Sequence, residues 1–238
     1  MRRLLLIFCV AGATAVYTCA QSGIEVPGIG MIVDSSGALR PVQGVAGSFL
    51  LGPASMSGAL SAACSEQLCL AKTDSKIISA TGGIDAPPGP AIFGFSGAEA
   101  IIFFPEVHTF ARWQNDILET LDRVVDGVVL SISATEIAVR NDGEVSIVHV
   151  DGSVVNSIPD ASGPVLLLPK GVVFATKDEV VLRQDGSEVR FALAGAQSIT
   201  AMGAHYVAIR AGGADAAIYA LRIDSGRESL FLLPGNVP

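Results

Sequence analysis

The chain repeats itself at a regular interval, and this feature most constrains the fold. Residues 112–133 align without a gap with residues 149–170, at an offset of 37. Residues 148–155 align with residues 182–189 at an offset of 34, so that Asp-Gly-Ser at 151–153 faces Asp-Gly-Ser at 185–187. Asp-Gly between alternating apolar residues predicts a tight hairpin, because both turn positions favour a positive φ. The chain is therefore expected to be a series of antiparallel hairpins.

Each repeat contains four predicted strands, which in one copy are 128–132, 136–140, 144–150 and 153–158. A unit of this length cannot bury both faces of its own sheet, which is typical of a β-propeller blade. We therefore expect an all-β protein, a small β-propeller of five or six four-stranded blades. The alternative is another antiparallel β-repeat array; a stacked β-solenoid fits less well, because its coils are shorter and parallel. The second strands are predicted to centre near Leu70, Ile102, Ala138, Phe174 and Ala208, at spacings of 32, 36, 36 and 34.

One segment locally favours a helix. Asp116 and Glu119 resemble a capping pair, and apolar residues from Trp113 to Val124 fall at near-helical spacing. The same segment aligns without a gap with one that contains an Asp-Gly turn. We therefore predict strand here, with Trp113 between blades.

The N-terminal hairpin sets the blade count. The segment from Gly30 to Gly47 resembles the opening hairpin of exported bacterial β-propeller-type repeat proteins of uncharacterised function. The resemblance implies the fold and no activity. Five complete units follow one half-unit that lacks its first two strands, so both five and six blades remain open.

Exposed strand edges promote association, so the first and last units of a propeller are expected to meet. We predict that residues 30–42 dock against residues 218–223 and 228–233, with Phe231 and Leu232 available for burial. The other interpretation of the half-unit is that a partner chain completes the ring.

The first twenty residues have the three parts of a secretory signal peptide. Arg2 and Arg3 precede an apolar run from residue 4 to 16, and Thr18 and Ala20 suit cleavage before Gln21. We expect residues 1–20 to be a signal peptide and residues 21–238 to form a single β-propeller-like repeat domain, secreted or periplasmic. A lipoprotein anchored at Cys19 is the less favoured alternative.

Loss of Arg2 and Arg3 with this leader takes the formal net charge from −8 to −10. So acidic a chain is a poor partner for nucleic acid or anionic lipid. No later segment has the roughly 18 consecutive apolar residues of a membrane span.

Cys64 and Cys69 are the cysteines that remain after leader removal. In an oxidising compartment their spacing predicts a disulfide across a hairpin. The alternative is two buried thiols on adjacent strands.

No motif indicates catalysis, a cofactor or a metal. His108, His149 and His205 lie in three different units and are expected to be structural. The common hydrolase signatures are missing, and the Asp-Gly pairs belong to turns rather than to a calcium loop.

The leading functional hypothesis is an exported non-catalytic binding or interaction protein. It would use one face of the propeller to engage a protein or a cell-envelope component. The alternative is an exported hydrolase or lyase with Asp126, Asp160 and Glu228 converging on the channel. Paired carboxylates in the channel would favour the enzyme, and an apolar channel would favour binding.

Overall fold

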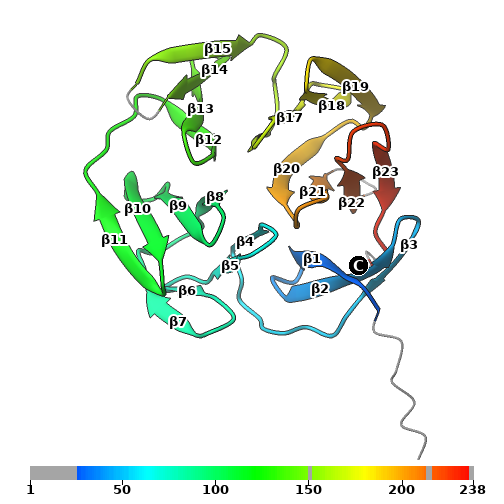
Figure 1. Ribbon diagram of the computed structural model, residues 1–238, viewed down its shortest axis with the longest axis horizontal. Coiled ribbons are helices and arrows are strands. Elements are labelled where there is room, and N and C mark those ends of the chain that lie inside the picture. The colour runs from blue at the N-terminus through cyan, green and yellow to red at the C-terminus, as the bar shows by residue number, and fades with distance from the viewer. Residues whose placement is uncertain (1–25, 150–151, 213–215, 236–238) are drawn as a thin grey trace, which may run out of the picture.

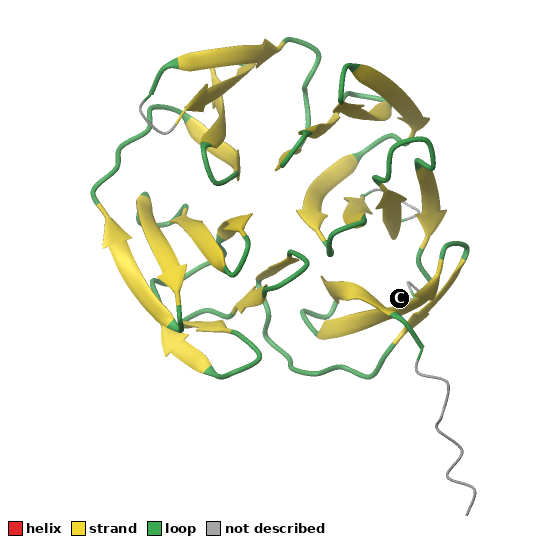
Figure 2. Ribbon diagram, viewed as in Figure 1, coloured by secondary structure: helices red, strands yellow, loops and turns green. Residues whose placement is uncertain are grey.

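The computed structural model describes residues 26–149, 152–212 and 216–235. The predicted signal peptide, with its cleavage site and Cys19, lies outside these residues. The described chain is built from strands and turns, and Figure 2 shows the strands arranged around a central axis. No helix in these ranges is long and apolar enough to cross a membrane.

The strands form six antiparallel sheets that follow one another around a ring, as Figure 1 shows. Blade 1 has three strands and the other five blades have four each, so the protein is a six-bladed β-propeller. Within each blade, consecutive strands pair with one another. The bounds are, for blade 1, β1 (Gly28–Val33), β2 (Leu39–Val45) and β3 (Ser48–Leu51); for blade 2, β4 (Ser61–Cys64), β5 (Cys69–Lys72), β6 (Lys76–Ile78) and β7 (Gly83–Asp85); for blade 3, β8 (Ile92–Ser96), β9 (Glu99–Phe104), β10 (Thr109–Gln114) and β11 (Ile117–Leu121); for blade 4, β12 (Val128–Ile132), β13 (Glu136–Asn141), β14 (Glu144–His149) and β15 (Val154–Ile158); for blade 5, β16 (Val165–Leu168), β17 (Gly171–Ala175), β18 (Glu179–Gln184) and β19 (Ser187–Ala192); and for blade 6, β20 (Ala196–Ala201), β21 (Tyr206–Ala211), β22 (Ala217–Arg222) and β23 (Ser229–Leu232).

The repeat-based strands match the observed ones closely, and blade 4 differs from its predicted bounds by no more than one residue at any end. The predicted Asp-Gly turns at residues 142–143 and 185–186 also have the expected positive φ. Asp142 and Asp185, each followed by glycine, have φ values of 48° and 51°. Short polar side chains tolerate this left-handed conformation, and the following glycine does so without steric cost.

Burial between blades forms the core. Trp113 on β10 is 2 % exposed and packs in one cluster with Leu70 and Ile77 of blade 2. The prediction of strand for this segment, and of Trp113 between blades, is confirmed. The helical pattern was overridden because burying these residues against a neighbouring sheet satisfies their apolar surface equally well.

Blade 1 departs from the predicted half-unit. Gly30 of β1 lies against Met202, directly after β20. Val33, at the other end of β1, accepts a hydrogen bond from Arg210, near the end of β21. Strand β1 therefore runs in the direction of β21, the second strand of its neighbour. We infer that blade 1 contains second, third and fourth strands and lacks only the innermost one. The expectation that it lacked two strands was wrong, because the short β3 had not been recognised.

The ring closes where blade 1 meets blade 6, and, as predicted for residues 30–42, Ile32 and Val42 pack in one cluster with Ile218 and Ala220. The ring of Phe49 on β3 lies 5.7 Å from that of Tyr206 and 5.5 Å from that of Phe231, both edge-on. Arg210 Nη2 donates a hydrogen bond of 2.5 Å to the carbonyl oxygen of Val33. Leu232, which was expected to be buried here, is 62 % exposed. Its side chain lies on the other side of β23 from Phe231, as the strand alternation requires.

Candidate functional site

The two ends of the propeller axis present different loops. We call the end of the axis where the innermost strands begin the start face. The turns that connect second to third strands lie on this face, at residues 34–38, 73–75, 105–108, 142–143 and 176–178. We call the opposite end the end face. The turns that connect the innermost strands to the second strands lie there, at residues 65–68, 97–98, 133–135, 169–170 and 202–205.

Carboxylates recur on the start face at equivalent positions. Asp74, Glu106, Asp142 and Asp178 each lie in the turn between the second and third strands of blades 2 to 5, and all four residues are exposed. Blade repetition places them around the axis. The loops between blades add three further exposed acids on the same face, Asp122, Asp126 and Asp160.

Basic groups are scarce among the described start-face loops. Lys177 is exposed, whereas the guanidinium of Arg123 lies over the Phe110 ring, 5.5 Å from its centroid. Desolvation, together with nearby Arg112, lowers the pKa of Arg123. The described loops of the start face therefore carry an excess of negative charge.

Blade 1 has an acid in its corresponding turn, but that charge is neutralised locally. Asp34 Oδ1 accepts hydrogen bonds from Ser36 Oγ and from the backbone N–H groups of Ser36 and Ala38. Its Oδ2 accepts from Arg40 Nε at 2.6 Å. The Ser36 and Arg40 hydrogen bonds, with the backbone donors, hold the pKa of Asp34 far below its ordinary value of 3.8.

A buried lysine supports one of the acidic turns. Lys72 on β5 is fully buried, and its Nζ donates to the carbonyl oxygens of Thr73 and Asp74 at 2.6 and 2.9 Å. Desolvation lowers the pKa of Lys72, and the nearby Asp74 carboxylate opposes this shift. The buried ammonium group thus fixes the backbone of the turn that carries Asp74.

A cavity of about 460 Å³ lies on the axis at the start face. Five of the six blades line it through β4, β8, β12, β16 and β20, and no described residue of blade 1 contributes. Its walls are mainly alanine, valine, isoleucine, leucine and phenylalanine, with Arg140 at the rim. Arg140 Nη2 donates to the carbonyl oxygen of Gly163 at 2.6 Å, which links blade 4 to blade 5.

The structure does not bring the three candidate catalytic carboxylates together. Asp126 and Asp160 lie on start-face loops, whereas Glu228 lies in the turn before β23, on the end face. None of them lines the axial cavity, and none of its described lining residues carries a carboxylate or an imidazole.

A second cavity, of about 590 Å³, opens on the end face where blades 1, 2 and 6 meet. We call it the seam cavity. His205 Nδ1 lies 2.6 Å from Asp224 Oδ1, and Arg222 Nε donates to Asp224 Oδ2, also at 2.6 Å. The lining residues are Pro27, Gly28, Ile29, Gly44, Val45, Ala46, Ser65, Glu66, Gly203, Ala204, His205, Tyr206 and Arg222.

The surroundings of Asp224 and Arg222 favour the ionised form of each. Burial opposes ionisation of Asp224, but hydrogen bonds with Arg222 and His205 hold its pKa below the ordinary value. The Asp224 hydrogen bond in turn raises the pKa of Arg222. The Asp224 carboxylate therefore orients two side chains that border the cavity.

The predicted disulfide is confirmed, and it shapes the seam cavity. The Cys64 and Cys69 sulfurs are bonded at 2.07 Å, closing the hairpin that carries Ser65 and Glu66 into the cavity lining. Ser65 Oγ accepts hydrogen bonds from the backbone N–H groups of Gln67 and Leu68. The hairpin is thus held by a covalent bond and by its own turn.

The three histidines remain apart. His108 sits in a start-face turn with a φ of 49°, edge-on to Phe103. His149 is exposed at the end of β14. Only His205 joins a polar cluster, and sequence reasoning missed its partner. The signal was present, because antiparallel pairing of Tyr206 with Arg222 places His205 beside the residues that follow Arg222.

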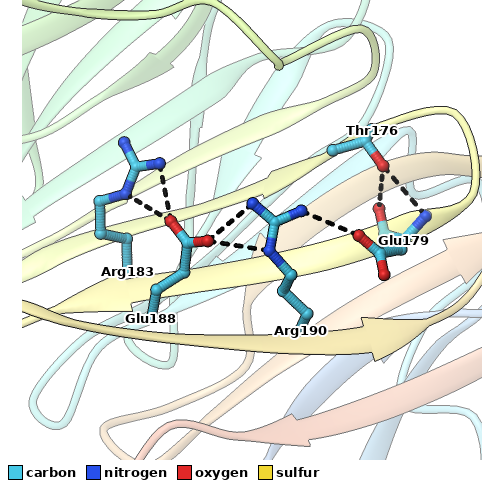
Figure 3. A network of polar contacts seen from close by, with 5 residues as sticks. All are labelled: Thr176, Glu179, Arg183, Glu188 and Arg190. Atoms are coloured by element: carbon cyan, nitrogen blue, oxygen red, sulfur yellow. Dashed lines mark hydrogen bonds and ion pairs between the residues drawn. The ribbon is translucent and has the colours of Figure 1, made fainter.

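Blade 5 has a separate ionic network on the surface of β18 and β19, shown in Figure 3. Arg183 contacts Glu188 at 2.8 Å, and Arg190 bridges Glu188 and Glu179 at 2.7 and 3.0 Å. Two arginines and two glutamates compensate one another, so this surface contributes little net charge to either face. Exposed pairs of this kind also contribute little to stability.

Comparisons with known proteins identify no family. No protein-family model matches the chain, and no curated protein matches it. Among solved structures, Kluyveromyces lactis Hsv2 is similar over 74 % of this chain and 63 % of that chain, with 14 % identity and a TM-score of 0.47. PorZ, described as a surface component of the type-IX secretion system of Porphyromonas gingivalis, is similar over 89 % of this chain and 38 % of that chain, with 12 % identity and a TM-score of 0.49.

AztD from Citrobacter koseri is similar over 87 % of this chain and 71 % of that chain, with 11 % identity and a TM-score of 0.43. The chain spans less than two thirds of the length of the Hsv2 and PorZ chains. Structural similarity at these TM-scores and identities does not indicate a function. The assignment of the propeller architecture is based on the six sheets of the chain itself.

Proposed function

We propose that the protein is an exported, non-catalytic binding protein whose start face engages a basic surface of a partner protein outside the cytoplasm. The observation that carries this proposal is the recurrence of an exposed carboxylate in the equivalent turn of four consecutive blades, at Asp74, Glu106, Asp142 and Asp178. A face of one sign steers a complementary partner and fixes its orientation.

The axial cavity supports binding over catalysis. General acid–base catalysis needs titratable groups within hydrogen-bond reach of one substrate. The three carboxylates of the hydrolase or lyase hypothesis are divided between the two faces. The mainly apolar cavity walls are the arrangement that favours a binding protein.

The Cys64–Cys69 disulfide supports export, because disulfides persist in oxidising compartments and are rare in reducing ones. The predicted signal peptide points to the same compartment. A basic partner is therefore sought in the cell envelope or in the external medium.

The test compares two variants of equal net charge. The first carries Asp74→Asn, Glu106→Gln, Asp142→Asn and Asp178→Asn on the start face. The second carries Glu119→Gln, Glu136→Gln, Asp185→Asn and Glu228→Gln, all away from that face. Asparagine tolerates the positive φ at positions 142 and 185, so both variants are expected to fold.

Tagged wild type and both variants are expressed in the producing organism, and the bound protein is eluted with a salt gradient. We expect wild type and the second variant to retain a partner that salt releases, because exposed charges are screened as ionic strength rises. The start-face variant is expected to retain none. Equal retention by both variants, or elution that ignores salt, would refute the proposal.

A further inference from the structure

The seam cavity is lined by charged groups of both signs from different blades. Among the described residues, the Asp224 carboxylate contacts Nε of Arg222 and Nδ1 of His205. Arg222 Nη1 and Nη2 have no hydrogen-bond partner among the described residues. Blade 6 therefore offers the cavity the guanidinium donors of Arg222, which the Asp224 carboxylate already orients.

The opposite charge comes from blade 2. Glu66 lines the cavity from the tip of the hairpin closed by Cys64 and Cys69, and its carboxylate has no ion pair or hydrogen bond within the described chain. Because the disulfide fixes this hairpin, Glu66 is held at the cavity rim without a protein cation to neutralise it.

The remaining lining is small or apolar. Gly28, Gly44 and Gly203 expose backbone to the cavity, and Ile29, Val45 and the Tyr206 ring add apolar surface. A volume of about 590 Å³ falls within the range of small-molecule sites, roughly 300–1,000 Å³.

We propose that the seam cavity binds a small zwitterion, a free amino acid or short peptide, with its carboxylate at Nη1 and Nη2 of Arg222 and its ammonium group at Glu66. A simple anion would leave Glu66 unpaired, and a simple cation would face Arg222. A zwitterion compensates both, and its side chain contacts the apolar part of the lining. The site lies on the end face and is independent of the partner surface proposed above.

The test is calorimetry with three matched probes: alanyl-leucine, its N-acetyl derivative and its C-terminal amide. Wild type is expected to bind the free dipeptide and to bind each blocked probe at least about tenfold more weakly, as expected for a lost charge-assisted hydrogen bond. Arg222→Gln should abolish the preference for the free carboxylate over the amide. Glu66→Gln should abolish the preference for the free amine over the acetylated one.

Arg227→Gln is the control, since Arg227 is exposed on the same face and does not line the cavity. Glu66 lies at an exposed hairpin tip, so Glu66→Gln tests the site even if Arg222→Gln loosens the Asp224 cluster. No heat with the free dipeptide, equal binding of all three probes, or an unchanged amine preference in Glu66→Gln would overturn the proposal. The start-face variant should bind the dipeptide like wild type, which separates failure of this inference from failure of the proposed function.

Discussion

Cys64, the last residue of β4, and Met202, directly after β20, form a parallel β-bridge. This contact joins the innermost strands of blades 2 and 6 across blade 1, which has no innermost strand of its own. Six blades form the ring (Figure 1). The described residues that line the axial cavity come from five of them. Cys64 is also bonded to Cys69, so the ring-closing bridge adjoins the hairpin whose Ser65 and Glu66 line the seam cavity.

Ring closure requires a glycine at position 30. A Cβ built there would lie 1.3 Å from the carbonyl oxygen of Met202, which is backbone and cannot rotate away. We expect Gly30→Ala to lower the free energy of unfolding by about 3 kcal/mol, as severe overpacking does. Gly28→Ala is the control, because a Cβ at Gly28 meets no atom within 4 Å. Equal thermal denaturation midpoints for the two variants would contradict the close crossing of β1 over Met202.

The sequence predicted most of this architecture and little of its seam. Asp-Gly turns and apolar alternation are local signals, and they located blade 4 almost to the residue. The sequence could not show that blade 1 lacks only its innermost strand. Strand β3 is short, and the direction of β1 in the ring depends on its contacts with Met202 and Arg210, far along the chain. The His205–Asp224 pair depends instead on the local register of β21 and β22, which the predicted strand centres did not specify.

The Asp34 turn should make stability sensitive to acid. A carboxyl whose folded pKa lies below its unfolded value stabilises the fold fully above the unfolded pKa, and this contribution is lost as pH falls toward the folded pKa. The stabilisation from Asp34 is thus complete above about pH 4 and declines below its ordinary pKa of 3.8.

We expect Asp34→Asn to lower the free energy of unfolding by about 1–2 kcal/mol at pH 7, mainly through the weakened hydrogen bond from Arg40. The difference from wild type should shrink as the pH is lowered toward 2 in denaturant titrations. Asp122→Asn, an exposed start-face control, should follow wild type. A difference that stays constant with pH would show that the Asp34 charge is not responsible.

The Cys64–Cys69 bridge should stabilise only modestly. Loop-closure entropy for so short a loop corresponds to about 2 kcal/mol. We expect Cys64→Ala/Cys69→Ala to lose about that amount and to remain folded, as measured by chemical denaturation. Peptide mapping without reduction should find both cysteines in one linked fragment, and two alkylated thiols in native secreted protein would contradict this assignment.

Export predicts a defined N-terminus. Intact mass of the secreted protein should correspond to a chain that begins at Gln21, because Thr18 and Ala20 suit signal peptidase cleavage. A species that retains Met1, or one that carries lipid on Cys19, would show that the leader has been misinterpreted.

The claim that the start face is the binding surface is tested most directly by site-specific photo-crosslinking. A photoreactive residue replaces Asp142 on the start face in one protein and Asp185 on the end face in another, at equivalent Asp-Gly hairpin positions with nearly equal φ. Both proteins are secreted by the producing organism and irradiated. We predict one covalent adduct with a basic protein from position 142 and none from position 185. An adduct from position 185 alone would contradict the account.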